Sequence, residues 1–221
     1  FVASVSHEFR SPLGGLALMI ETLLEDKVGS HSRKREYLEQ MQRETRRLTR
    51  LSENLLALGR IRHTGRAGGQ AWTPARVLDA AVGQVQSDAD SKKVHMAVSV
   101  EADLPDGTGD ADLVQMALLN LVDNAVKSSP EASRVDVSAS MDDGAVRFTV
   151  ADRGPGVPPR ERHKIFDWFY RPGRELERRT RGTGLGLAIV RAVADRHGGR
   201  VEVSDRSGGG ATLSGGEPLL Q

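Results

Sequence analysis

The chain lacks several features that mark whole classes of protein. It has no cysteine among its 221 residues, which excludes disulfide bonds, zinc sites built on thiolates and cysteine nucleophiles. No apolar run approaches the roughly 20 residues of a membrane-spanning helix, and no P-loop of the form G-x-x-x-x-G-K-[ST] occurs. The formal net charge is only +1, so no bulk field favours nucleic acid or an anionic membrane.

A start methionine and a leader are also missing. The first residue is Phe1, and no signal peptide follows it. We therefore expect the chain to be a cytoplasmic portion of a longer protein. Its composition, 38% hydrophobic and 28% charged residues, is typical of a soluble globular protein.

An apolar stripe with helical spacing fills the beginning of the chain. Its members recur every three or four positions, at Val5, Phe9, Leu13, Leu16, Ile20 and Leu23. After a short polar break at 28–32, a second helical pattern repeats its apolar residues as in a coiled coil. One hairpin cannot bury both stripes, so the sequence predicts that residues 1–61 form a homodimeric four-helix bundle.

His7 lies beside this stripe and is expected to face solvent, about 200° around the helix from its nearest apolar neighbours. Ser11 follows one turn later on the same face. Pro12 removes a helical hydrogen bond, and Gly14 and Gly15 each cost about 1 kcal/mol relative to alanine. We hypothesise that the helix bends here and that the bending gates access to His7.

The rest of the chain predicts a second domain. Residues 62–73 are polar and rich in glycine, which indicates a linker before a domain at 74–221. That domain is expected to be α+β, with helices on one face of a sheet. Helices are predicted over 75–91, 110–128 and 185–196, with a short one near 161–169, and strands over 95–100, 135–141, 146–150, 201–203 and 211–213.

Two patterns in this second domain suit a nucleotide and its cation. Asn120, Asn124 and Lys127 share one helix face, where amide oxygens suit a hard cation such as Mg²⁺ and the lysine suits phosphate. Asp152 opens a D-x-G-x-G run directly after a strand. Glycines there admit a ligand close to the backbone, and the carboxylate can accept a hydrogen bond from an amino group such as that of adenine.

Two further patterns suit phosphate. The glycine loop 182–186 opens into a helix, whose N–H groups and dipole favour an anion. Residues 165–171 place aromatic side chains before an arginine-rich stretch, which we interpret as a basic lid containing Arg174, Arg178, Arg179 and Arg181. Each pattern alone is more often a solvated helix face or a turn.

In this order, the patterns resemble the motifs of a sensor histidine kinase core. The run His7-Glu8-Phe9-Arg10-Ser11-Pro12-Leu13 resembles the H motif, and the N, first glycine, F and second glycine motifs correspond to 120–127, 152–156, 166–171 and 182–186. The resemblance covers essentially the whole chain. It implies a dimerisation and phosphotransfer hairpin at 1–61 and, at 74–221, the Bergerat ATP-binding fold shared with gyrase.

The resemblance also implies residue roles. His7 would be the phosphoacceptor and Glu8 its base, after which the phosphoryl group passes to an aspartate of a response regulator. ATP and Mg²⁺ would be the cofactors, with Asn124 and Asn120 at the cation, Lys127 and Arg171 at the phosphates and Asp152 at the adenine amino group. Further nucleotide contacts are implied for Gly154, Gly156, Val157, Tyr170, Gly182, Thr183, Gly184, Leu185, Gly186 and Thr212. The parent protein would be anchored in the plasma membrane, as most of the family is.

Some positions depart from the family pattern. Ser128 stands where an aromatic residue commonly lies beside the nucleotide, and Leu213 stands in place of a frequent phenylalanine. Ser11 occupies the position of a threonine or asparagine that supports phosphatase activity, which leaves that activity open. Two alternatives therefore remain: another Bergerat-fold ATPase or serine kinase, and a catalytically weak dimer scaffold. The other histidines are expected at the surface or in the linker: His31, His63, His95, His163 and His197.

Overall fold

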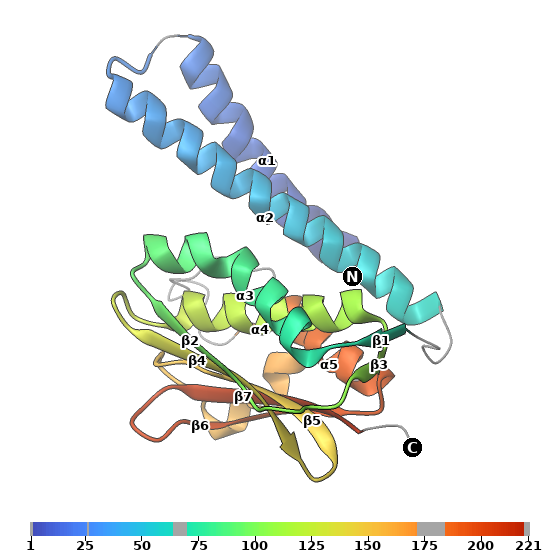
Figure 1. Ribbon diagram of the computed structural model, residues 1–221. Helices are drawn as coiled ribbons and strands as arrows, with labels where there is room; N and C mark the ends of the chain where they lie inside the picture. Colours follow the sequence, from blue (N-terminus) through green and yellow to red (C-terminus); the bar gives the residue numbers. More distant parts are fainter. Residues whose placement is uncertain (1, 26, 64–69, 172–183, 219–221) are drawn as a thin grey trace. The chain divides into compact units, whose positions relative to one another are not determined.

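The computed structural model describes residues 2–25, 27–63, 70–171 and 184–218 (Figure 1). The chain divides into two compact units, Phe1–Leu56 and Ala57–Gln221. The first is built from helices alone, and the second from a sheet with helices. Within the described ranges, no helix is both long enough and apolar enough to cross a membrane.

Two long helices form the first unit and confirm the predicted hairpin. Helix α1 spans Val2–Leu24 and continues through Pro12, while α2 spans His31–His63, its last turns being counted with the second unit. Large apolar side chains remain in water on both helices. Leu18 is 65% exposed and Leu24 is 80% exposed on α1, and Leu38 is 57% exposed on α2.

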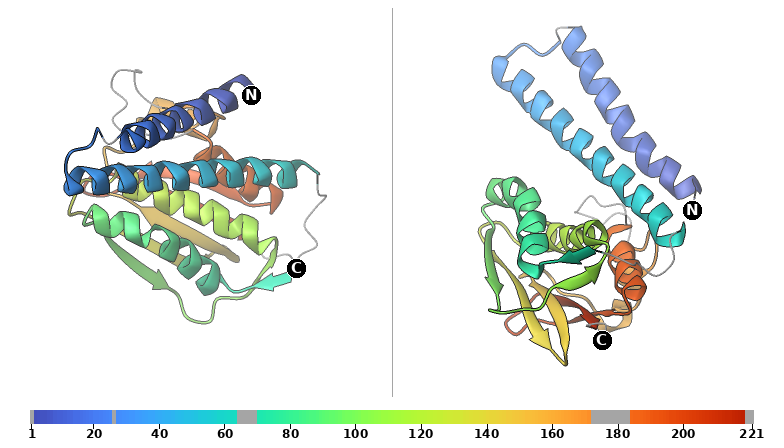
Figure 2. Two further views of the ribbon diagram at one scale, coloured as in Figure 1. Left: turned by 90° about the horizontal axis from the view of Figure 1, so that it is seen from above. Right: turned by 45° about the vertical axis from the view of Figure 1, so that its right-hand side comes forward.

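A five-stranded sheet is the centre of the second unit. In spatial order its strands are β2 (His95–Val100), β4 (Arg134–Asp142), β5 (Ala145–Ala151), β7 (Ala211–Pro218) and β6 (Arg200–Asp205). Strands β2 and β4 are parallel, and the other pairs are antiparallel. One face of the sheet is covered by α3 (Pro74–Ser91), α4 (Ala111–Ser128) and α5 (Gly186–Arg196) (Figure 2). This is the predicted α+β arrangement.

Alternation along the strands explains why one face is covered. Val135, Val137 and Ala139 of β4 are buried, whereas the residues between them are half-buried. The turn into β5 is made by Asp143 and Gly144, whose φ angles are 47° and 74°. Two positive φ values are typical of the tight hairpin turn that the Asp-Gly pair predicts.

The composition of residues 62–73 predicts a linker, but the end of this segment is structured. Gln70–Trp72 form strand β1, which pairs antiparallel with β3 (Gly107–Gly109). The Trp72 indole is buried and stacks on Phe148, with ring centroids 6.2 Å apart. Gly107 makes room for it, because a Cβ at that position would collide with the indole. A three-residue strand carries too little periodicity for prediction from sequence.

The prediction of a short helix over 161–169 is wrong. The chain instead makes two 3₁₀ turns, η1 (Pro159–Glu161) and η2 (Lys164–Phe166). Ile165 and Phe166 are buried at the second turn, so the packing of these two side chains fixes the segment.

Candidate functional site

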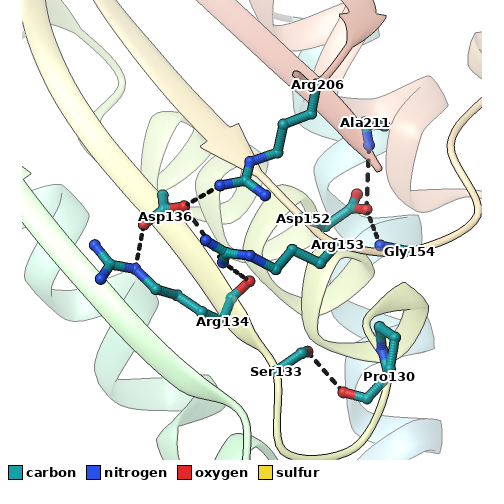
Figure 3. Close-up of polar contacts among 9 residues, drawn as sticks. All are labelled: Pro130, Ser133, Arg134, Asp136, Asp152, Arg153, Gly154, Arg206 and Ala211. Atoms are coloured by element: carbon teal, nitrogen blue, oxygen red, sulfur yellow. Dashed lines mark hydrogen bonds and ion pairs between the residues drawn. The ribbon is translucent and has the colours of Figure 1, made fainter. Parts of the chain in front are cut away.

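Asp152 is a buried carboxylate just beyond the end of β5, with 3% of its surface exposed. Its Oδ1 accepts hydrogen bonds from the backbone N–H groups of Gly154, at 2.7 Å, and Ala211, at 3.2 Å (Figure 3). Both bonds end on the same oxygen. Its Oδ2 accepts no hydrogen bond from the part of the chain that the structure describes, so it is available to a ligand's amino group.

Three glycines allow the backbone to close around this carboxylate. A Cβ on Gly154 would lie 2.7 Å from the carbonyl oxygen of Ser128, and one on Gly210 would collide with the carbonyl of Asp152. Gly156 and Gly210 both have positive φ, +75° and +104°. Gly154 and Gly156 are evident from the sequence pattern. Gly210 is not, and the only signal for it is the three-glycine run in which it stands.

Helix α4 ends beside this turn and carries the predicted asparagines. Its N-terminus is capped by Asp110, which accepts the Leu113 N–H at 3.2 Å, as the sequence predicts. The Nδ2 of Asn120 donates to the carbonyl of Met116 at 3.0 Å. Its Oδ1 lies beside the first residue of α5, because a Cβ on Gly186 would come within 2.9 Å of it. The N motif and the start of α5 therefore meet.

The other two residues of that helix face, Asn124 and Lys127, are at least partly accessible to solvent. Asn124 is half-buried, and the exposed Lys127 forms an ion pair with Asp123 one turn earlier. Among the described residues, no three His, Cys, Asp or Glu side chains gather as a metal cage.

The F motif and the second glycine motif are joined by a hydrogen bond. The N–H of Phe169 donates to the carbonyl of Gly184 at 2.9 Å. Gly184 has φ +68°, and a Cβ there would lie 2.7 Å from the Phe169 backbone. Tyr170 and Arg171 follow and are half-buried. Gly182, Thr183 and the predicted lid arginines lie outside the described residues.

Other predicted site residues lie in different places. Leu185 is fully buried, so only its backbone is available at the start of α5. Thr212 pairs with Ala151 and alternates with the buried Leu213, so it lies on the uncovered face of the sheet. Val157 is half-buried. Ser11 is exposed on α1; His7 and Glu8 belong to the same helix, but their side chains lie outside the described part of the structure.

Lys92, which the sequence does not mark, caps the end of α4. It follows α3, and its Nζ donates to the carbonyls of Val126 at 3.0 Å and Lys127 at 2.8 Å. These are among the last carbonyls of the helix, which have no partner within it. Burial lowers the pKa of Lys92 below its usual 10.5, because the ammonium is partly removed from water.

The expectation that His197 lies at the surface or in a linker is wrong. It is half-buried at the end of α5, where its Nδ1 lies 2.9 Å from the carbonyl of Val193. Its Nε2 accepts the backbone N–H of Asp110 at 3.3 Å. These contacts require the neutral tautomer with its proton on Nδ1. His197 therefore ties the start of α4 to the end of α5.

Comparison with known proteins also divides the chain into a helical N-terminal part and a second part that contains the sheet. Residues 1–64 match the family model of the His Kinase A (phospho-acceptor) domain. Residues 109–215 match the model of the histidine kinase-, DNA gyrase B-, and HSP90-like ATPase.

Individual relatives span both parts. The sensor-like histidine kinase SenX3 of Mycobacterium tuberculosis is 34% identical over 100% of this chain and 53% of its own length. The structure of the mycobacterial sensor histidine kinase MprB is 32% identical, with a TM-score of 0.58 over 68% of this chain and 99% of that one. Full-length ShkA in complex with AMPPNP is 31% identical, with a TM-score of 0.69 over 99% of this chain and 45% of that one. The chain spans about half the length of the curated relatives it matches.

Proposed function

Because the chain belongs to the sensor histidine kinases of two-component systems, we propose that it transfers the γ-phosphoryl group of ATP to His7. From His7 the group would pass to an aspartate of a response regulator. The observation that carries the proposal is Asp152, a buried carboxylate that keeps Oδ2 for an amino group inside a glycine cradle. The nucleotide complex of the similar ShkA supports ATP as the donor.

Base recognition would fall to Asp152 and phosphate binding to the α4–α5 side. Oδ2 of Asp152 would accept the adenine amino group, while Gly154, Gly156 and Val157 allow the base to approach the backbone. Lys127, released from Asp123, and Arg171 would contact phosphate oxygens. The glycines of the second motif and the N–H groups at the start of α5 would face the same phosphates. Thr212, on the uncovered face, would contribute only through its backbone.

The amide pair on α4 fits a magnesium ion that arrives with the nucleotide. Mg²⁺ commonly keeps several waters and binds through few protein oxygens together with substrate phosphates. Asn124 would hold it, with Asn120 as the second ligand, and no carboxylate cage is needed. When bound, the ion would neutralise charge that develops on the transferring phosphoryl group.

The protein's own contribution to the transfer is positioning and one proton. The bond between the γ-phosphorus and the bridging oxygen of ADP breaks, and a bond to an imidazole nitrogen of His7 forms. Neutral imidazole is already nucleophilic near neutral pH. Glu8, its neighbour in the sequence, would orient the ring and take the proton that the second nitrogen loses. Ser11, one turn later, would orient a water if the chain also removes the phosphoryl group from the regulator.

The helical part would act as a homodimer. The exposed leucines of α1 and α2 support this, because a second hairpin would cover them in a four-helix bundle. The regulator would dock on the same bundle near His7. We propose 1–61 as the dimerisation and phosphotransfer domain, 62–73 as the connection and 74–221 as the catalytic domain, with β1 contributing its strand to the latter.

Incubation with γ-labelled ATP and Mg²⁺ tests the proposal. Wild-type chain should acquire acid-labile label, His7→Ala should acquire none, and His31→Ala should label normally, because His31 is an exposed histidine at the start of α2. Equal labelling of the wild type and His7→Ala would move the acceptor elsewhere and favour a serine kinase. ATP binding without any label would favour a nucleotide-binding scaffold.

A further inference from the structure

A cluster of three arginines surrounds one carboxylate behind the Asp152 site (Figure 3). Asp136 of β4 forms ion pairs with Arg134 at 2.5 Å, Arg206 at 3.0 Å and Arg153 at 3.5 Å. The guanidinium of Arg153 also donates to the carbonyl of Arg134 at 2.6 Å. Asp136 is the only acidic partner of these three guanidiniums within the described residues.

Two of these arginines come from the two loops that hold Asp152. Arg153 lies between Asp152 and Gly154, whose N–H donates to Oδ1. Arg206 begins the turn between β6 and β7, and its own N–H donates to the carbonyl of Gly210 at 3.1 Å. Ala211, which follows Gly210, donates its N–H to Oδ1 of Asp152 at 3.2 Å. Each loop thus supplies one donor to Asp152 in front and one arginine to Asp136 behind.

The register of the sheet makes this two-sided arrangement possible. Asp136 pairs with Ala151, which pairs with Thr212, which pairs with Ser204, so the four residues form one row. Residues of one row share a face, and this row lies on the uncovered face, opposite to the Asp152 side chain. The residues between the two ends of the row, Ala151 and Thr212, are small. Small side chains at these two positions leave room for the guanidinium of Arg206, which donates to Asp136 at 3.0 Å. Figure 3 shows this contact.

We propose that Asp136 is a positioning residue for base recognition: by holding Arg153 and Arg206 together, it fixes the two N–H donors that orient the carboxylate of Asp152. The inference rests on the proposed nucleotide function and adds to it a residue outside every motif. Asp136 does not touch the ligand. Its side chain is 32% exposed on the far face, so its effect reaches the site only through the two loops.

The position of Asp136 predicts an effect confined to the base. If the loops loosen, Oδ2 of Asp152 no longer lies where the adenine amino group needs it. The phosphate contacts proposed for the α4–α5 side come from other elements and are left intact. Loss of the ion pairs between Asp136 and the two arginines should therefore weaken binding only for nucleotides that carry the amino group.

The test compares ADP with the diphosphate of purine riboside, which is ADP without its 6-amino group. Affinities of the full chain are measured by calorimetry with Mg²⁺ present. Asp136→Asn and Arg206→Gln should each weaken ADP binding about three- to tenfold, the range expected for one misplaced hydrogen bond. Binding of the analogue should stay unchanged, so the preference for ADP over the analogue should narrow by the same factor.

A matched control lies on the same strand. Asp142→Asn removes a carboxylate that also pairs with an arginine, Arg147, but at the other end of β4. It should bind both nucleotides as the wild type does. Unchanged ADP affinity in Asp136→Asn and Arg206→Gln would overturn the inference, and so would an equal loss for ADP and the analogue, which indicates general destabilisation. If the wild-type chain bound neither ADP nor the analogue, the proposed function would be refuted, and the inference with it.

Discussion

At the scale of single residues, Gly209 and Gly210 show that a glycine can be required either for its backbone conformation or for the space that a side chain would fill. Both lie in the turn before β7 and both have positive φ, +97° and +104°. A Cβ on Gly209 would meet nothing within 4 Å, whereas one on Gly210 would collide with the carbonyl of Asp152. The first glycine is needed for its backbone conformation alone, and the second also for space at the site.

Alanine at each position measures the difference. Gly209→Ala should cost about 1–2 kcal/mol of unfolding free energy, the cost of a left-handed conformation for an L-residue. Gly210→Ala adds overpacking of about 1–3 kcal/mol and should also weaken ADP binding, because Ala211 moves away from Oδ1. Urea unfolding and calorimetric titration measure both effects. Equal losses of stability with unchanged binding would show that the close approach at Gly210 is unimportant.

The residues of the site differ in how visible they are in the sequence. Asp152 and Gly154 form one hydrogen bond within one short run, so their pattern can be recognised. Ala211 reaches Asp152 from 59 positions away and Arg206 reaches Asp136 from 70 positions away. Only the pairing of β4, β5 and β7 brings these residues together, and a single sequence does not contain that register.

At the scale of elements, the long helices and the β4–β5 hairpin follow from periodicity, a capping aspartate and an Asp-Gly turn. Strand β1 and the 3₁₀ turns do not, because the burial of Trp72, Ile165 and Phe166 decides them. The cap that Lys92 places on α4 belongs to the same group: it joins two helices through a side chain that looks solvated in the sequence.

Lys92→Met should destabilise the second unit by about 1 kcal/mol, because it leaves carbonyls at the end of α4 without their donor. Where the structure describes the chain, the neighbour Lys93 pairs only with the exposed Glu131, so Lys93→Met should cost less than about 0.5 kcal/mol. Urea unfolding at neutral pH compares the two. If both variants lost the same amount, the cap would have no special role.

The pKa of Lys92 adds a dependence on pH. Because burial lowers this pKa in the folded state, the unfolded chain binds the proton more tightly. The free energy of unfolding of the wild type should therefore increase as pH rises from the lowered pKa toward 10.5. In Lys92→Met, the free energy of unfolding should not show this increase over the same pH range.

Helix α1 offers a test of gating. It continues through Pro12, and a Cβ on Gly14 or Gly15 would meet nothing within 4 Å. Replacing all three residues by alanine should stabilise the helix by about 1 kcal/mol per glycine and slow the labelling of His7. The control is Gly59→Ala in α2, which is also sterically open. A gain in stability with an unchanged labelling rate would refute the gating hypothesis.

At the scale of the whole molecule, the two units are stabilised by different means. The second has a core of its own around the sheet, whereas the first leaves leucines exposed on a single hairpin. The stability of the first should therefore depend on association with another copy, and that of the second on its ligand.

Scanning calorimetry should accordingly resolve two transitions. One should move to higher temperature with protein concentration, as expected for a dimeric bundle. The other should move with ADP, which at a hundred times its dissociation constant adds about 2.7 kcal/mol. A single transition that responds to both variables would show that the units unfold together.

The stacking of Trp72 on Phe148 has a spectroscopic consequence. The chain has two tryptophans, and both belong to Ala57–Gln221. Trp72 is buried, with no partner for Nε1 among the described residues, and should emit at short wavelength beyond the reach of iodide; Trp168, 42% exposed, should emit at longer wavelength and be quenched. Tryptophan fluorescence, excited at a wavelength that Tyr37 of α2 does not absorb, will therefore report on the second unit and remain blind to the helical hairpin. A melting curve recorded with this probe alone would make the protein look like one cooperative body.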